Sequence, residues 1–96
     1  MEHMDVLLRY WPDDAAAYAI RGGMYQKRRQ YEQALQDMNR AIELEPKNPD
    51  FYISRALLYK DFRKTSLATD DFRKAIELGA SAEECASMML DNEGGK

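Results

Sequence analysis

A pattern of residues recurs after 34 positions, and this internal repeat is the strongest constraint on how the chain can fold. The identical pairs are Tyr18 and Tyr52, Arg21 and Arg55, Tyr25 and Tyr59, Arg29 and Arg63, Ala34 and Ala68, Asp37 and Asp71, and the Ala-Ile-Glu-Leu runs at 41–44 and 75–78. Self-similarity at a fixed period of this length is typical of stacked supersecondary units.

Proline follows the same register, since Pro46 lies 34 residues after Pro12. The chain is therefore expected to form a single domain that opens part-way through a unit. The predicted divisions are the end of a partial repeat over 1–14, complete repeats over 15–48 and 49–82, a capping helix over 82–91 and a frayed tail over 92–96.

The spacing of apolar residues inside each unit predicts two helices and no strand. The predicted helices cover residues 15–28, 31–44, 49–62 and 65–78, with a partial helix before Trp11. Expected capping residues are Asp14, Asn48 followed by Pro49 at the first helical position, Thr65 or Ser66, Gly79 as a left-handed closing residue, and a capping box of Ser81 with Glu84.

Small and large side chains alternate where the helices of one unit should touch. Gly22 and Ala56 occupy equivalent places on the first helix of each unit, and Ala34 and Ala68 on the second. Small residues at these places allow two helices to approach closely. The four repeated tyrosines that flank them are expected to belong to the core: Tyr18, Tyr25, Tyr52 and Tyr59.

Composition is that of an ordinary soluble domain, with 45% hydrophobic and 32% charged residues among 96. No apolar run approaches the roughly 20 residues needed to cross a bilayer, and no signal-peptide pattern opens the chain, so no membrane association is expected. A cytoplasmic location is favoured, with a signal peptide already removed as the alternative. One cysteine, Cys85, and one histidine, His3, offer neither an internal disulfide nor a zinc ligand set, and no cofactor is expected.

The net charge of −3 argues against a general nucleic-acid binder. Basic residues nevertheless gather in the turns inside the repeats, and acidic ones around the turns between them. Either these charged turns are simply solvated surface, or their electrostatic potential steers a charged partner toward the protein. The basic residues are Lys27, Arg28, Arg29, Lys60, Arg63 and Lys64, and the acidic residues are Asp13, Asp14, Glu45 and Asp50.

With Tyr-x-x-Arg-Gly-x-x-Tyr, then Ala34, Met38 and Pro46, the chain resembles the tetratricopeptide repeat family. The resemblance implies an all-α fold, a right-handed superhelical stack of antiparallel helix hairpins with a C-terminal capping helix. The sequence departs from the family pattern at four positions: Arg21 and Arg55 replace leucine, Ala56 replaces glycine, and Ala80 replaces proline.

Each arginine that replaces the leucine of the family pattern is followed 16 residues later by an aspartate. The pairs are Arg21 with Asp37 and Arg55 with Asp71. A helical arginine is usually a solvated surface residue. Here the arginine lies beside Gly22 or Ala56, on a stripe that the second helix should cover. We therefore expect two ion pairs, Arg21 with Asp37 and Arg55 with Asp71, that hold each hairpin together and are structural rather than catalytic.

The resemblance also implies that a peptide or partner protein binds along the concave side, which is lined by the first helix of each unit. Carried onto this sequence, the lining stripe is Ala16, Ala19, Gly23, Gln26, Asp50, Ile53, Leu57 and Lys60. The alternative is that a neighbouring unit or the terminal helix covers these residues. One subfamily clamps the C-terminal carboxylate of heat-shock chaperones with Lys and Asn in this stripe, but Ala19, Gly23 and Ser54 occupy those places here, so chaperone-tail binding is not expected.

An enzyme is the contrasting hypothesis, and the sequence lacks the residues for it. No nucleophile is paired with a base in a recognisable motif, and there is no glycine-rich phosphate loop. Glu83 and Glu84 diverge by about 100° on a helix and cannot face one another. Cys85 is interpreted as a small apolar packing residue, with a redox role as the alternative.

Self-association is a third hypothesis, because a solenoid end that leaves its apolar face uncovered needs a cap or a partner. One outcome is a homo-oligomer through the ends marked by Trp11 or Met88, and the alternative is that the chain is a piece of a longer repeat array. The apolar residues at the N-terminal end are Met4, Val6, Leu7, Leu8, Tyr10 and Trp11, and those at the C-terminal end are Cys85, Met88, Met89 and Leu90.

Overall fold

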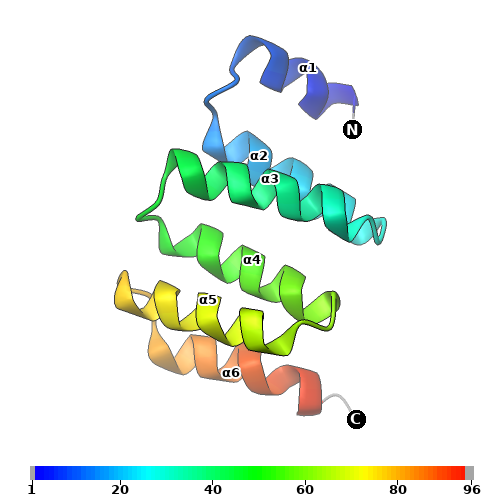
Figure 1. Ribbon diagram of the computed structural model, residues 1–96. Helices are drawn as coiled ribbons and strands as arrows, with labels where there is room; N and C mark the ends of the chain where they lie inside the picture. Colours follow the sequence, from blue (N-terminus) through cyan, green and yellow to red (C-terminus); the bar gives the residue numbers. More distant parts are fainter. Residues whose placement is uncertain (1, 95–96) are drawn as a thin grey trace. The chain divides into compact units, whose positions relative to one another are not determined.

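The computed structural model describes residues 2–94, and side chains over 3–89. The described residues form six α-helices and no strand (Figure 1). The helices are α1 (Glu2–Tyr10), α2 (Ala15–Lys27), α3 (Tyr31–Leu44), α4 (Pro49–Asp61), α5 (Thr65–Glu77) and α6 (Ala82–Gly94). They divide into two compact units, with α1 to α3 in the N-terminal unit and α4 to α6 in the C-terminal unit, and the boundary lies between Pro46 and Lys47.

Each unit is built on one helix hairpin, α2 with α3 and α4 with α5 (Figure 1). Only three residues separate the two helices of a hairpin. A connection this short makes the helices antiparallel neighbours. The hairpins coincide with the two predicted repeats, so the helix pairs expected from the 34-residue period are present.

The starts of α2 and α4 follow the expected capping chemistry. The Asp14 side chain accepts a hydrogen bond of 3.2 Å from the backbone N–H of Ala17. Asn48 accepts one of 3.0 Å from the N–H of Asp50, and Pro49 is the first helical residue of α4. Each bond satisfies one of the N–H groups that lack a partner in the first turn of a helix.

The start of α5 differs from the expectation that Thr65 or Ser66 caps this helix. Thr65 is already helical, and the N-cap is Lys64, whose side chain makes no capping hydrogen bond. The N–H of Ala68 bonds at 3.0 Å to the carbonyl of Lys64, which brings Thr65 into the first turn. Its hydroxyl therefore lies one position too late to serve as the cap.

The turns that close the hairpins place arginine in the left-handed region of backbone space. Arg29 and Arg63 have φ of 62° and 63°. In the first turn the N–H of Gln30 bonds at 2.9 Å to the carbonyl of Tyr25, and the N–H of Arg29 bonds at 2.9 Å to that of Gln26. These are the two bonds of a Schellman motif, which usually has glycine where arginine stands here. Gly79, with φ of 116°, closes α5 as expected.

The terminal helix α6 begins as expected, because the Ser81 hydroxyl accepts a hydrogen bond of 3.2 Å from the N–H of Glu84. The prediction that residues from 92 onward are frayed is wrong for 92–94, since α6 extends to Gly94. Residues 95 and 96 lie outside the described part of the chain. Asn92 and Gly94 have low helix propensities, which favours a helix that ends before them. Propensity alone is a weak indicator of where a helix ends.

In the N-terminal unit, α2 packs closely against α3 at one place and against α1 at another. Gly22 on α2 lies so close to α3 that a Cβ added to it would be 3.2 Å from the Ala34 carbonyl oxygen and 3.3 Å from Asp37 Cβ. This close approach is what the small residue at position 22 predicted. Elsewhere on α2, Ala17 forms a small buried cluster with Met4 and Leu8 of α1.

The C-terminal unit contains the largest fully buried side chains in the described part of the chain. They are Leu58 of α4, Phe72 of α5 and Cys85 of α6, so each of the three helices contributes a fully buried side chain. Helix α6 contacts both members of the hairpin. It therefore covers the end of this unit, as a capping helix does.

Candidate functional site

Each hairpin contains the arginine–aspartate ion pair that the repeat spacing indicated. In the N-terminal unit, Arg21 Nε donates to Asp37 Oδ2 and Nη2 donates to Oδ1, both at 2.8 Å. In the C-terminal unit the corresponding distances between Arg55 and Asp71 are 2.7 and 2.8 Å. Both contacts are bidentate, the strongest geometry available to an arginine and a carboxylate.

The carboxylates of these pairs are much less accessible than ordinary surface acids. Side-chain exposure is 6% for Asp37 and 8% for Asp71, against 21% for each arginine. Among the described side chains, no buried polar atom lacks a hydrogen-bond partner. The pairs are therefore satisfied contacts between the two helices of a hairpin and leave little carboxylate surface for a ligand.

Two tyrosines flank each arginine on its own helix, three residues before it and four residues after it. The Arg21 guanidinium carbon lies 5.9 Å from the ring centroid of Tyr18 and 5.8 Å from that of Tyr25. Tyr52 and Tyr59 flank Arg55 at 5.7 and 5.9 Å. These distances permit cation–π attraction, so the tyrosines are not simply apolar wedges.

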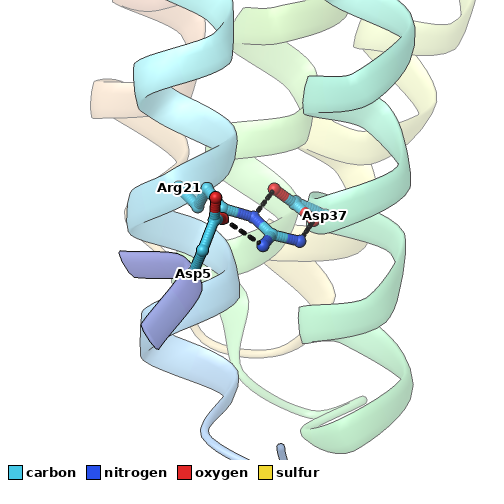
Figure 2. A network of polar contacts seen from close by, with 3 residues as sticks. All are labelled: Asp5, Arg21 and Asp37. Atoms are coloured by element: carbon cyan, nitrogen blue, oxygen red, sulfur yellow. Dashed lines mark hydrogen bonds and ion pairs between the residues drawn. The ribbon is translucent and has the colours of Figure 1, made fainter. Parts of the chain in front are cut away.

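Arg21 has a third partner that the sequence did not indicate. Its Nη1 donates to Oδ1 of Asp5 on α1 at 2.8 Å, so the guanidinium joins α1, α2 and α3 (Figure 2). Hydrogen bonding to Asp37, opposed in part by burial and reinforced by Asp5, raises the pKa of Arg21. A raised arginine pKa keeps the guanidinium charged across the working pH range, so both carboxylates face a permanent positive charge.

The predicted binding stripe on α2 is open at its centre. An added Cβ at Gly23 would meet nothing within 4 Å. Ala16 is exposed, and Ala19 and Gln26 are partly exposed. Gly22, one residue earlier, faces α3, so neighbouring glycines have different surroundings: one permits close helix packing and the other lies on an accessible face.

The stripe on α4 is partly accessible and is contacted at one end. Asp50 is exposed, whereas Ile53 and Leu57 are partly buried. The ammonium group of Lys60 donates a hydrogen bond to the backbone carbonyl of Met88 on α6. The alternative that the terminal helix covers part of the stripe therefore applies at Lys60.

The basic turn residues lie at the closed ends of the hairpins. Arg28 and Arg29 are exposed in the turn of the N-terminal unit, as are Arg63 and Lys64 in that of the C-terminal unit. Within the N-terminal unit, Asp13 and Asp14 lie at the opposite end of α2. Each hairpin thus carries a basic tip, a term used below for these four residues.

The residues considered for a catalytic role differ in their exposure to solvent. Glu83 and Glu84 are exposed neighbours on α6, whereas Cys85 is buried. Burial, and secondarily the negative charge of Glu84, raise the pKa of the Cys85 thiol. A raised pKa disfavours the reactive thiolate, which agrees with a packing role. Within the described residues, no group of three or more His, Cys, Asp and Glu could hold a metal ion.

None of the helices described is both long and apolar enough to cross a membrane.

Comparison with known proteins identifies the repeat. The family model for the tetratricopeptide repeat matches residues 22–61. Human "Tetratricopeptide repeat protein 13" is 32% identical over 87 residues, which cover 85% of this chain and 10% of that protein. Mouse "Sperm-associated antigen 1" is 36% identical over 64 residues, covering 67% of this chain and 7% of that protein.

A third relative is the "UDP-N-acetylglucosamine--peptide N-acetylglucosaminyltransferase" of Giardia intestinalis, 34% identical over 70 residues that cover 73% of this chain and 5% of the enzyme. The chain thus spans a tenth or less of the length of these curated relatives. The residues described by the structure form six helices with two hairpins, and together with the repeat pattern this means that the chain belongs to the tetratricopeptide repeat family. Repeats of this family are generally protein–protein interaction modules, and the fold itself is not a catalytic one.

Proposed function

We propose that the chain is a non-catalytic interaction module that receives a short segment of a partner protein on the first helices of its hairpins. The contact residues are Ala16, Ala19, Gly23 and Gln26 on α2 and Asp50, Ile53, Leu57 and Lys60 on α4. The observation that carries the proposal is the open face at Gly23, where backbone could approach the helix without meeting a side chain.

The chemistry of the two stripes supports a peptide rather than a small polar ligand. The α2 stripe is small and offers close approach, and Ile53 and Leu57 add apolar contact on α4. Gln26, Asp50 and Lys60 can fix orientation through hydrogen bonds. Because two hairpins provide a limited contact area, the affinity of the isolated module should be micromolar or weaker.

The arginine–aspartate pairs would support this function indirectly. They join the second helix of each hairpin to the first, so they hold the stripe-bearing helices α2 and α4 in place. Their low exposure argues that they do not contact the partner themselves.

Affinity capture with the intact protein tests the proposal. Gly23→Glu and Leu57→Glu should each release partners that the unmodified protein retains, whereas Arg63→Gln with Lys64→Gln at the basic tip should not. Helical circular dichroism checks that each variant remains folded. If the stripe variants keep their partners and the tip variant loses them, recognition belongs to the basic tips and the proposal is wrong.

Self-assembly is the second candidate, and the exposed apolar residues favour the N-terminal end for it. Val6, Tyr10 and Trp11 are exposed, whereas Met88 and Met89 at the other end are partly buried and Cys85 is fully buried. Sedimentation should then show a mass that rises with concentration and falls on Trp11→Glu. The same measurement on Met88→Glu tests the C-terminal end. A monomer at all concentrations, unchanged by both substitutions, contradicts self-assembly.

A further inference from the structure

An open cavity of about 350 Å³ lies at the junction between α1 and α2 in the N-terminal unit. Five consecutive residues line it: Tyr10, Trp11, Pro12, Asp13 and Asp14. None of them belongs to the stripe on α2. The cavity is therefore separate from the stripe, and a ligand could occupy it whether or not the stripe binds a partner.

Two aromatic rings at this cavity remain accessible to solvent. Tyr10 is 71% exposed and Trp11 is 60% exposed. Their centroids lie 6.2 Å apart with an interplanar angle of 59°. Tyrosine and tryptophan faces carry negative potential and attract cations.

The two aspartates that line the cavity, Asp13 and Asp14, also favour the binding of a cation. Asp14 is partly committed to capping α2, where it accepts from the Ala17 N–H at 3.2 Å. Asp13 is 83% exposed, and its ion pair with Arg40 of α3 is long, at 3.9 Å. A long pair between exposed groups is weak and does not prevent another cation from approaching the carboxylate.

We propose that this cavity binds the basic side chain of a partner peptide, with arginine preferred. A guanidinium combines the two features that the lining residues recognise, since it stacks on aromatic faces and forms hydrogen bonds to a carboxylate in one plane. Asp13 supplies the carboxylate, and Trp11 with Tyr10 supplies the rings. Arg40 pairs with Glu43 at 3.1 Å and reaches Asp13 at 3.9 Å, so it is a weak internal competitor for Asp13.

Substitutions of Asp13 and of Arg40 should change cation binding in opposite directions. Asp13→Asn removes attraction and should weaken binding of a cation. Arg40→Gln removes a positive charge near the same carboxylate and should strengthen it. A general disturbance of the turn would weaken binding in both variants, so the opposite signs separate recognition from structural damage.

Trp11 is the one tryptophan of the chain, so its fluorescence reports on the cavity directly. The intact protein is titrated with N-acetyl-arginine amide, and with N-acetyl-citrulline amide as the uncharged control of the same shape. The arginine probe should give a saturable change with roughly millimolar affinity, as expected for one side chain. The change should weaken on raising the salt concentration.

The expected variant effects are a loss of about two- to fivefold in affinity for Asp13→Asn and a gain for Arg40→Gln, a range in keeping with exposed cation contacts. An equal response to citrulline, no saturable response to arginine, or weakening in both variants would overturn the proposal. Sedimentation should give the same mass for the unmodified protein and Asp13→Asn. A fall in mass for Asp13→Asn would assign the cavity to the basic tip of a second copy and would also overturn it.

Discussion

Arg55 and Asp71 form two parallel hydrogen bonds of 2.7 and 2.8 Å that join α4 to α5, and Arg21 and Asp37 repeat this contact between α2 and α3. Removing the aspartate of such a pair leaves a partly buried guanidinium without its partner. Asp71→Ala should therefore lower the free energy of unfolding by about 2 to 4 kcal/mol, below the loss for a fully buried pair because Arg55 is 21% exposed.

A double-mutant cycle separates the pair from its surroundings. Arg55→Leu restores the residue that the family pattern has at this place, so Arg55→Leu with Asp71→Ala should be more stable in urea than Asp71→Ala alone. The coupling energy should exceed 1 kcal/mol, as it does for residues in direct contact. Additive losses below 1 kcal/mol would show that the two residues do not stabilise the hairpin as a pair.

Adjacent glycines on α2 should respond to alanine in opposite directions. A Cβ at Gly22 would lie 3.1 Å from Met38 Sδ and 3.2 Å from the Ala34 carbonyl oxygen. Because the backbone oxygen cannot easily move aside, Gly22→Ala should destabilise the protein by about 1 kcal/mol or more despite its gain in helix propensity. Thermal melts of Gly23→Ala provide the matched control, with an expected gain of about 0.5 to 1 kcal/mol. Equal effects at the two positions would contradict the close helix approach at Gly22.

Glycine should improve the hairpin turns at the arginines with positive φ. Arg63→Gly removes the unfavourable contacts of a side chain at φ of 63° and should stabilise the protein by about 0.5 to 1 kcal/mol. Arg28→Gly removes the same charge from a position with φ of −89° and should give no gain. The comparison is made by urea denaturation. Stabilisation by both substitutions would point to relief of charge repulsion rather than to backbone conformation.

Cys85 should report on whether α6 stays packed against its hairpin. Its thiol is buried and its pKa is raised by that burial, so it should react slowly with a disulfide reagent at neutral pH. Cys85→Ala combined with Ala86→Cys moves the thiol to the exposed neighbour and should react at once. Similar rates for the two proteins would mean that α6 opens readily.

The same thiol predicts a pH dependence with a definite sign. Because folding raises its pKa, the stabilisation that Cys85 contributes is complete below the ordinary thiol pKa of about 8.5 and is lost as the pH rises toward the raised value. Between pH 7 and pH 10 the unmodified protein should lose more stability in urea than Cys85→Ala does. Parallel pH profiles would contradict the burial of the thiol.

The repeat period made the helices predictable, because each apolar and small position is present twice. Tyr31–Leu44 was predicted to the residue, and the spacing of 16 between Arg21 and Asp37 indicated their contact. Both cases depend on residues within one hairpin, where a short connection leaves few possible arrangements.

Contacts that the repeat does not duplicate were not predicted. Asp5 lies in the partial repeat, so nothing in its spacing indicated that it bonds to Arg21. The contact of Lys60 with the Met88 carbonyl depends on how α6 packs. Because every residue has a backbone carbonyl, the sequence does not indicate which one accepts the hydrogen bond. The positive φ of Arg29 and Arg63 was missed because glycine, not arginine, is the usual signal for that conformation.

We propose that a partner segment binds the stripes on α2 and α4. The most direct test is to titrate the isotopically labelled protein with the segment recovered by affinity capture and to follow its backbone amide resonances. We expect the shifts to concentrate at Ala19, Gly23, Ile53 and Leu57 and to disappear for Leu57→Glu. Shifts confined to the basic tips, or to the cavity between Tyr10 and Asp14, would contradict the claim.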